Sequence, residues 1–256
     1  MGSEDAEIVR QVWDSYLPVA FRLDPEEEAS LHAPQPHYTM VSRLSYFPLV
    51  LEKALKHLLR SEEKRETGDL WLESDGTPLK WHYPVGVLFD LLGACIPWTV
   101  TIHFRHFPEH QLVRCQSRAA VEAHLIHALK ESDALRNRSQ VMSSLQKKDH
   151  NQLWLGVCND KFDQFWAVNR KLNASDPRYV PLRVHARDQT VRQKLVKPVM
   201  EGRETTLADA VDAVLGADAA GKRILIHGLE VPPETPLLWL SKHMSHCDNF
   251  VHICAL

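Results

Sequence analysis

A five-residue pattern, Thr-Pro-Leu-x-Trp, occurs twice in this 256-residue chain, at 77–81 and again at 235–239. Each copy is followed by a predicted short helix and then by a strand in which an apolar residue precedes a histidine, at 102–103 and 251–252. Internal similarity of this kind indicates a duplicated structural unit. The predicted order in each copy is an antiparallel hairpin, one helix, and a last strand that returns to the sheet. That order is typical of the β-grasp, or ubiquitin-like, fold.

The elements of the first copy are predicted from the spacing of its apolar residues. Alternation over 17–23 and an extended stretch over 38–46 predict two strands, and Pro48 fits the first turn of a helix. Its remaining predicted elements are a strand at 70–73, a short helix at 85–92 and a strand at 98–104.

The second copy follows the same order. Alternation over 180–184 and the stretch 191–200 predict two strands, and Thr206 can cap the helix that follows it. The remaining predicted elements are a buried strand at 224–226, a short helix after Trp239 and a strand at 250–254.

The middle third of the chain is predicted to be helical. Apolar residues at helical spacing in 118–135 and in 151–172 indicate two amphipathic helices. The second presents Trp154, Phe162 and Trp166 on one side, which is too aromatic to be left in water. This aromatic side and the duplicated units, together with the family resemblance described below, predict a helix-binding groove where these helices meet the two ubiquitin-like units.

These patterns predict an α+β fold with two ubiquitin-like β-grasp domains flanking a helix-rich domain. The predicted divisions are an N-terminal helix (1–14), a first ubiquitin-like domain (15–105), a linker and helix-rich domain (106–175) and a second ubiquitin-like domain (176–256).

Charge and motif content exclude several classes of function. The net charge of −3 argues against nucleic-acid binding, which requires a basic footprint. No phosphate-binding glycine motif is present, so no nucleotide cofactor is expected. The five cysteines form no CxxC pair and the N-terminus is acidic, so we expect no disulfide framework, no secretory signal and a cytoplasmic location. The middle segment has more basic than acidic residues, which keeps a weak membrane-surface contact open.

A group of histidines and cysteines near the C-terminus raises the question of a metal site. Its members are His243, His246, Cys247, His252 and Cys254. Structural zinc sites have ligand pairs at fixed short spacings, and this group lacks them. We therefore predict no metal, and read these residues as core cysteine and surface histidines.

A thiol enzyme is a second possibility. Cys115 lies among Arg114, Arg118 and His110, whose charges could lower the pKa of its thiol. Cys247 is the other candidate. No partner base can be identified from the sequence, and cysteine is also a common buried apolar residue, so we expect no catalytic residue of this kind.

Two charged residues are candidate interaction sites. Lys130 falls opposite the apolar stripe of the helix predicted at 118–135, so it is exposed if that helix is regular. Arg43 shares one face of a predicted strand with Val41. It either protects a sheet edge from aggregation or pairs with an acidic partner, and the pattern does not decide between the two.

Several longer segments resemble the autophagy protein 5 family. They lie in all three thirds of the chain and in the family's order. They are Gly76–Pro84 with Leu88–Leu92, Gln146–His150, Phe162–Leu172 and Asp248–Ile253. The connection at 173–177 looks short for the family.

The resemblance implies two ubiquitin-like domains around a helical domain, with no active site. It also implies that a lysine in a Lys-Glu-x-Asp-x-Leu segment, here Lys130, accepts the C-terminal glycine of the ubiquitin-like autophagy protein 12, delivered by conjugating enzymes. Glu131 and Asp133 could help to position the amine. Arg43 is carried over as a contact for the N-terminal helix of autophagy protein 16. The assembly would then act like a ligase in attaching autophagy protein 8 to phosphatidylethanolamine, at the surface of the phagophore. An unconjugated ubiquitin-like adaptor is the alternative.

Overall fold

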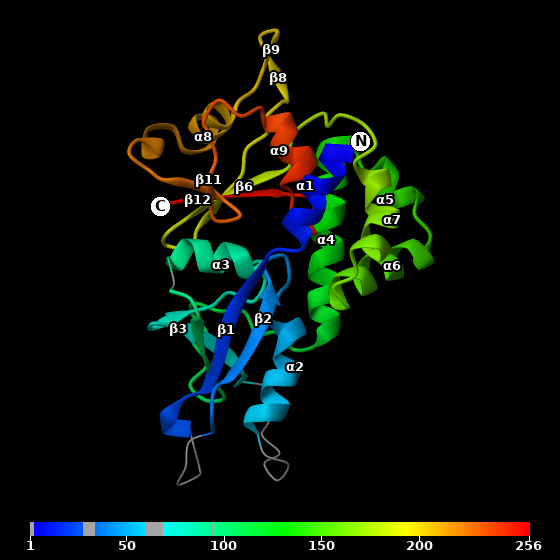
Figure 1. Cartoon of the computed structure of the whole chain (residues 1–256). Helices are drawn as coiled ribbons and strands as arrows, with labels where there is room; N and C mark the ends of the chain where they lie inside the picture. Colours follow the sequence, from blue (N-terminus) through cyan, green and yellow to red (C-terminus); the bar gives the residue numbers. More distant parts are fainter. Residues whose placement is uncertain (1–2, 28–33, 60–68, 94) are drawn as a thin grey trace. The chain divides into compact units, whose positions relative to one another are not determined.

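The computed structural model describes residues 3–27, 34–59, 69–93 and 95–256 (Figure 1). The chain forms two compact units. One comprises Tyr16–Phe89 and Gly93–Val121, and the other comprises Met1–Ser15, Asp90–Leu92 and Glu122–Leu256. The predicted α+β class, with two β-grasp domains and a helical segment between them in the sequence, is confirmed.

The first β-grasp domain is a five-stranded sheet with the order β2-β1-β5-β3-β4. β1 pairs antiparallel with β2 and parallel with β5, so the first and last strands lie side by side. The elements are β1 (Tyr16–Leu23), η1 (Pro25–Glu27), β2 (His37–Ser42), α2 (Phe47–Leu58), β3 (Trp71–Ser74), β4 (Thr77–Pro78), α3 (Val85–Leu92) and β5 (Trp98–His103).

The turn between β2 and α2 departs from the prediction. The sequence predicted an extended stretch to Tyr46, but β2 ends at Ser42. The backbone N–H of Ser45 donates to the carbonyl of Ser42 (3.2 Å), and the N–H of Leu44 donates to the Ser42 hydroxyl (3.3 Å). A serine hydroxyl that accepts a local backbone N–H favours a turn over a strand.

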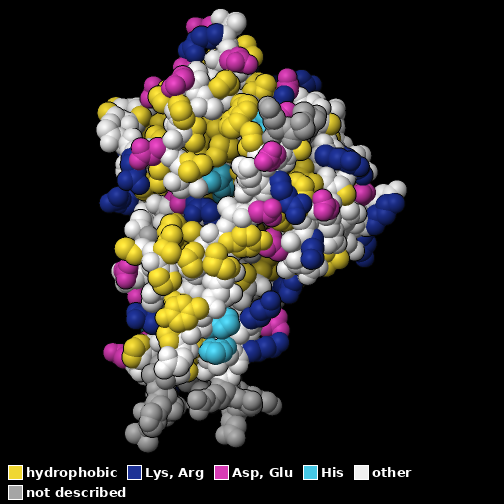
Figure 2. All heavy atoms as spheres, in the orientation of Figure 1, with side chains coloured by type: hydrophobic (Ala, Val, Ile, Leu, Met, Phe, Trp, Pro, Cys, Tyr) yellow, Lys and Arg dark blue, Asp and Glu magenta, His cyan; other side chains and the backbone are white. Residues whose placement is uncertain are grey.

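The helical segment contains α4 (Arg118–Asn137), α5 (Gln140–Ser144), α6 (Lys147–Cys158) and α7 (Phe162–Leu172). The N-terminal helix α1 (Ser3–Trp13) packs against α7. The centre of the Trp13 ring lies 5.7 Å from that of Phe162 and 5.3 Å from that of Phe165. On the face shown in Figure 2, Lys and Arg side chains gather along the right edge, where Figure 1 places α6 and α7.

The single helix predicted over 151–172 is wrong. The backbone leaves the helix after Cys158, and Asp160 takes a positive φ of 52° before α7 begins. The two helices then pack closely, because Gly156 leaves room for the backbone of Phe165.

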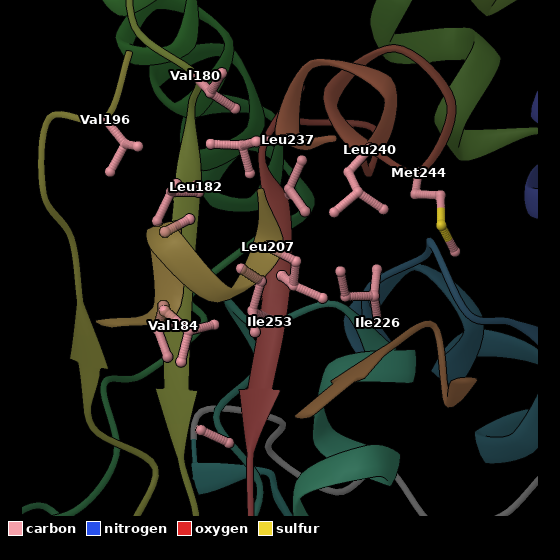
Figure 3. Packing of buried hydrophobic residues seen from close by; sticks show 14 of the residues in the cluster. Val180, Leu182, Val184, Val196, Leu207, Ile226, Leu237, Leu240, Met244 and Ile253 are labelled. Atoms are coloured by element: carbon pink, nitrogen blue, oxygen red, sulfur yellow. The ribbon is translucent and has the colours of Figure 1, made fainter. Parts of the chain in front are cut away.

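The second β-grasp domain repeats the topology of the first, with the order β11-β10-β12-β6-β7 and a parallel β6–β12 pair. Its elements are β6 (Leu182–Ala186), β7 (Val191–Arg192), β8 (Val199–Met200), β9 (Arg203–Glu204), α8 (Leu207–Leu215), η3 (Gly216–Ala219), β10 (Ile224–Ile226), β11 (Leu229–Glu230), α9 (Leu237–His243) and β12 (Val251–Ala255). Leu207 of α8 and Leu240 of α9 pack on Ile253 of β12 in its core (Figure 3).

The strand predicted over 191–200 is also interrupted. Only Val191–Arg192 pairs with β6, and Val199–Met200 pairs instead with β9 in a separate two-stranded ribbon. Residues 193–195 are exposed, and Pro198 has no N–H to donate to a ladder.

The repeated pentapeptide occupies different structural positions in the two domains. Thr77–Pro78 form strand β4, and the chain runs on as a loop to α3. Pro236, by contrast, is the N-cap of α9, so Trp239 lies inside the helix. The duplication is therefore real at the level of topology, although this motif is not equivalent in detail.

The α6–α7 contact yields a prediction. A Cβ at Gly156 would lie 2.8 Å from the Cα and N atoms of Phe165, which is closer than real Cβ contacts. Gly156→Ala should lower the free energy of unfolding by about 1–3 kcal/mol, because overpacking outweighs the roughly 1 kcal/mol that alanine usually adds in a helix. Denaturant unfolding measures this. Asn151→Ala, at an exposed position of the same helix, is the control; a stabilised Gly156→Ala protein would contradict the close packing.

Candidate functional site

Lys130 lies on the exposed side of α4, as the helical spacing predicted. The opposite side of the helix is buried through Val121, Leu125 and Leu129. This apolar stripe fixes the rotation of the helix, and the rotation leaves the Lys130 side chain exposed to solvent.

The two carboxylates near Lys130 are committed to other partners. Glu131 accepts hydrogen bonds from Arg183 Nη2 (2.9 Å) and Gln193 Nε2 (3.0 Å). Asp133 is fully buried and accepts from the backbone N–H of Met142 (2.8 Å). Both carboxylates therefore hold the helix that carries the amine. That they help to position the amine for attack stays a prediction.

Arg183 of β6 joins Glu131 to a buried carboxylate. Its Nη1 lies 3.2 Å from Asp248 Oδ2, and its guanidinium lies 3.8 Å from the centre of the Phe250 ring. Burial alone would raise the pKa of Asp248, but the charges of His252 and Arg183 and the hydrogen bond from His252 lower that pKa to about 2. Asp248 is thus a permanent anion at neutral pH.

Two histidines of the second β-grasp domain, His252 and His185, extend the hydrogen-bonded group that contains Asp248. His252 Nε2 lies 3.0 Å from Asp248 Oδ2, and its Nδ1 lies 2.8 Å from His185 Nε2. Both rings are buried, and so is that of His246; the burial of His246 and His252 corrects the expectation of surface histidines. His243 is also buried and contacts Asp5 of α1 at 3.0 Å.

One group in the described part of the chain has the spacing of a metal site, and it lies elsewhere. The ligand atoms of Asp24, Glu27 and His103 fall within 4.8 Å of one another. Glu27 already accepts the backbone N–H groups of Phe104 and Arg105, and Asp24 contacts His103 at 3.0 Å. These hydrogen bonds explain why the three side chains lie together: the two carboxylates hold the backbone and the His103 ring at the end of β5. The absence of a functional metal stays a prediction.

Arg43 is not on the strand edge where the sequence placed it. It lies in the turn after β2 with only 7% of its surface exposed. Its Nη2 donates to the carbonyl of Gly86 (3.4 Å), and the guanidinium lies 5.8 Å from the centre of the Phe89 ring. The alternation argument failed because the strand stops one residue earlier, and Arg43 instead ties this turn to α3.

The pKa values of the two candidate thiols are raised, whereas a nucleophilic cysteine needs a lowered pKa. Burial raises the pKa of the Cys115 thiol, and it raises the pKa of the fully buried Cys247 further. Cys115 lines an apolar cavity of about 400 Å³ between α2, β3 and the segment that precedes α4. Neither thiol is favoured as a thiolate, so the possible lowering by Arg114, Arg118 and His110 is not what the structure shows.

The aromatic side chains of α6 and α7 are partly accounted for within their own unit. Trp154 is 8% exposed, and Trp13 of α1 packs against Phe162. Trp166 is half-buried and contacts Phe162 and Phe165. The N-terminal helix therefore covers part of the apolar surface that the sequence left for a partner.

Sequence reasoning missed Arg183 and Asp248 as supports of Lys130. A signal was present in Leu182-Arg183-Val184, where a charged residue interrupts a buried strand. A buried arginine requires an anionic partner, although the sequence does not say which one.

Three models of one family match the chain. They are described as Autophagy protein ATG5, UblA domain (residues 12–104), alpha-helical bundle region (118–175) and UblB domain (179–255).

Full-length relatives and a solved structure agree with this match. Autophagy protein 5 of Drosophila melanogaster is 41% identical over 98% of this chain and 97% of its own length. Autophagy-related protein 5 of Caenorhabditis elegans is 32% identical over 98% of both chains. The crystal structure of Kluyveromyces marxianus Atg5 shares the fold, with a TM-score of 0.82, 21% identity, and coverage of 98% of this chain and 99% of that one. In the described part of the chain, no helix combines the length and apolar character that a membrane span requires.

The group formed by Asp248, Arg183 and His252 predicts a specific pH dependence of stability. A carboxyl with a folded pKa of about 2 and an unfolded pKa near ~3.9 stabilises the fold above pH ~4, and this contribution is lost as the pH falls toward 2. Asp248→Asn should destabilise the protein by about 3–5 kcal/mol at pH 7, because it leaves the largely buried Arg183 guanidinium without its anion. It should also remove about 2–3 kcal/mol of the decline in stability between pH ~4 and ~2.

Urea unfolding across this pH range tests both effects. The control is Asp163→Asn, at an exposed carboxylate, which should stay within about 0.5 kcal/mol of the wild type. An acid transition that is the same in Asp248→Asn and wild type would contradict the prediction.

Proposed function

This chain belongs to the autophagy protein 5 family and acts in autophagy, and from that premise we propose that it is a scaffold that accepts the ubiquitin-like autophagy protein 12 on Lys130. The observation that supports the proposal most is the exposure of Lys130 on a helix whose neighbouring carboxylates are both engaged elsewhere. The lysine is therefore accessible without being tied down by an adjacent acid.

The proposed reaction is the aminolysis of a thioester. The deprotonated Nζ of Lys130 attacks the carbonyl carbon of the C-terminal glycine, which a conjugating enzyme carries on its cysteine. The C–N bond forms and the C–S bond breaks. The proton lost by the amine replaces the acyl group on the departing sulfur. The chain itself supplies the nucleophile and its placement, which can be worth roughly 7–11 kcal/mol for well-oriented groups.

The conjugate is proposed to bind the N-terminal helix of autophagy protein 16 and to promote ligase-like transfer of autophagy protein 8 to phosphatidylethanolamine. This would place the protein in the cytoplasm and peripherally on the phagophore membrane during autophagosome formation. The basic side chains around α6 and α7 support a weak contact with an anionic membrane surface (Figure 2).

We propose that the chain is not itself an enzyme. The raised pKa values of Cys115 and Cys247 disfavour the thiolates that a thiol enzyme would need. If the protein's activity in autophagy survives replacement of all five cysteines, the chain is not a thiol enzyme. An unconjugated adaptor would run at 29.3 kDa on a denaturing, reducing gel, whereas the proposed scaffold should run mostly well above that mass.

Lys130→Arg tests the acceptor. The guanidinium stays protonated and is a poor nucleophile, so the heavier conjugated band should be lost while folding is unchanged. Immunoblotting of cell extracts measures the band, and Lys147→Arg and Lys148→Arg are controls at other exposed lysines. Persistence of the band in Lys130→Arg, or peptide mapping of the isopeptide to another lysine, would contradict the assignment.

Arg43 tests the proposed contact with the partner helix. Arg43→Gln removes the charge but retains a donor for the carbonyl of Gly86, so it should disturb the turn less than the charge reversal Arg43→Glu. If Arg43 pairs with an acidic residue of the amphipathic helix, Arg43→Gln should weaken binding by on the order of 1–3 kcal/mol in calorimetry. An unchanged affinity in a folded variant would place Arg43 outside the interface.

A further inference from the structure

We propose that Arg183 is a positioning residue for Lys130: it fixes the turn of α4 that presents the amine by joining Glu131 to the buried Asp248. This inference rests on the proposed function, because it concerns how the acceptor lysine is placed for attack. It adds a residue 53 positions further along the chain that touches neither the lysine amine nor the thioester.

The first link of this bridge holds the backbone next to Lys130. The Glu131 carboxylate receives Arg183 Nη2 at one oxygen (2.9 Å) and Gln193 Nε2 at the other (3.0 Å). Both oxygens are therefore used by donors from the second β-grasp domain. A surface helix turn with a doubly bound carboxylate has less freedom to rotate or fray than one held by packing alone.

The second link makes Arg183 a rigid donor. Its side chain is 14% exposed, lies over the Phe250 ring and binds Asp248 at 3.2 Å. Asp248 in turn accepts the backbone N–H of Phe250 and contacts His252, with 1% of its side chain exposed. The guanidinium is therefore held by buried groups on one side and presents one nitrogen to Glu131 on the other.

The bridge also determines the charge around the lysine. Glu131 and Lys130 are neighbours on α4 and point to different sides of the helix, so Arg183 changes the field at the amine only by neutralising the nearby carboxylate. Its main effect on the amine is to orient the helix turn. Misplacement of a reacting group by about 1 Å can reduce a rate by roughly 100-fold, so a loosened turn is expected to affect the chemical step.

The test measures single-turnover conjugation of the full chain with autophagy protein 12 loaded as a thioester on its conjugating enzyme; kcat here denotes the limiting rate constant, and KM the concentration of loaded enzyme that gives half of it. Arg183→Met should lower kcat by about tenfold and leave KM for the loaded enzyme within about twofold, because orientation is lost while the docking surface remains. Arg183→Lys, which keeps one charged donor, should recover part of the rate. Arg192→Met is the matched control, since Arg192 lies on the neighbouring strand and forms an exposed ion pair with Asp218.

A second readout separates positioning from loss of structure. Acetylation of Lys130 by acetic anhydride, followed by mass spectrometry, needs only an accessible amine and should be as fast in Arg183→Met as in the wild type. Glu131→Gln removes the carboxylate charge that Arg183 binds, so it weakens the bridge at its exposed end and leaves Arg183–Asp248 intact; it decides the matter if Arg183→Met does not fold. It should also lower kcat, by roughly threefold to tenfold.

Each remaining outcome overturns the inference. An unchanged kcat in Arg183→Met or in Glu131→Gln excludes a positioning role. An equal loss in Arg192→Met, or an equal loss of acetylation, assigns the effect to general destabilisation. If the wild-type chain forms no conjugate at all, the proposed function fails and this inference fails with it. A conjugate that forms on Lys130 but is indifferent to Arg183 overturns only the inference.

Discussion

Each β-grasp domain closes through hydrogen bonds between its first and last strands, which run parallel in the middle of the sheet. Parallel neighbours require a long crossover connection, and here the connection contains the rest of the domain. All five residues of β12 are buried as a result. His252 lies in this strand, Asp248 and Phe250 lie in the segment just before it, and Asp248 and Phe250 contact Arg183. The support of Lys130 therefore depends on a strand pairing at the centre of the other domain.

Much of the fold could be predicted because amphipathic patterns are local. The period of two in 17–23 and the period of 3.6 in 118–135 correspond to β1 and α4. The failures have local physical causes that periodicity does not contain. Asn159–Lys161 break a helix that has continuous aromatic patterning, and Pro198 interrupts a stretch that reads as one strand. The repeated pentapeptide led to the right duplication even though its two copies take different conformations, because the topology around them is what was duplicated.

In the candidate site, too, the features set by neighbours in the sequence could be predicted, and those set by distant residues could not. The exposure of Lys130 follows from its angle on the helix, which depends only on neighbours in the sequence. The partners of Glu131 could not be predicted, since Arg183 and Gln193 are 52 and 62 residues away and no spacing rule links them. The burial of Arg43 was missed for a subtler reason: one serine hydroxyl ends β2 just before it, and alternation is meaningless beyond the end of a strand.

The position of these supports along the chain has a consequence for synthesis. Proteins emerge from the ribosome with the N-terminal part first, at roughly 5–20 residues per second. Lys130 is therefore in solution before Arg183 exists, and Asp248 follows 65 residues after Arg183. On a nascent or truncated chain the lysine is present, but the bridge that orders its helix turn is not. Under the function proposed above, the acceptor would be structurally complete only once the last strand is made, and attachment to finished protein would be favoured over attachment to partly synthesised chains.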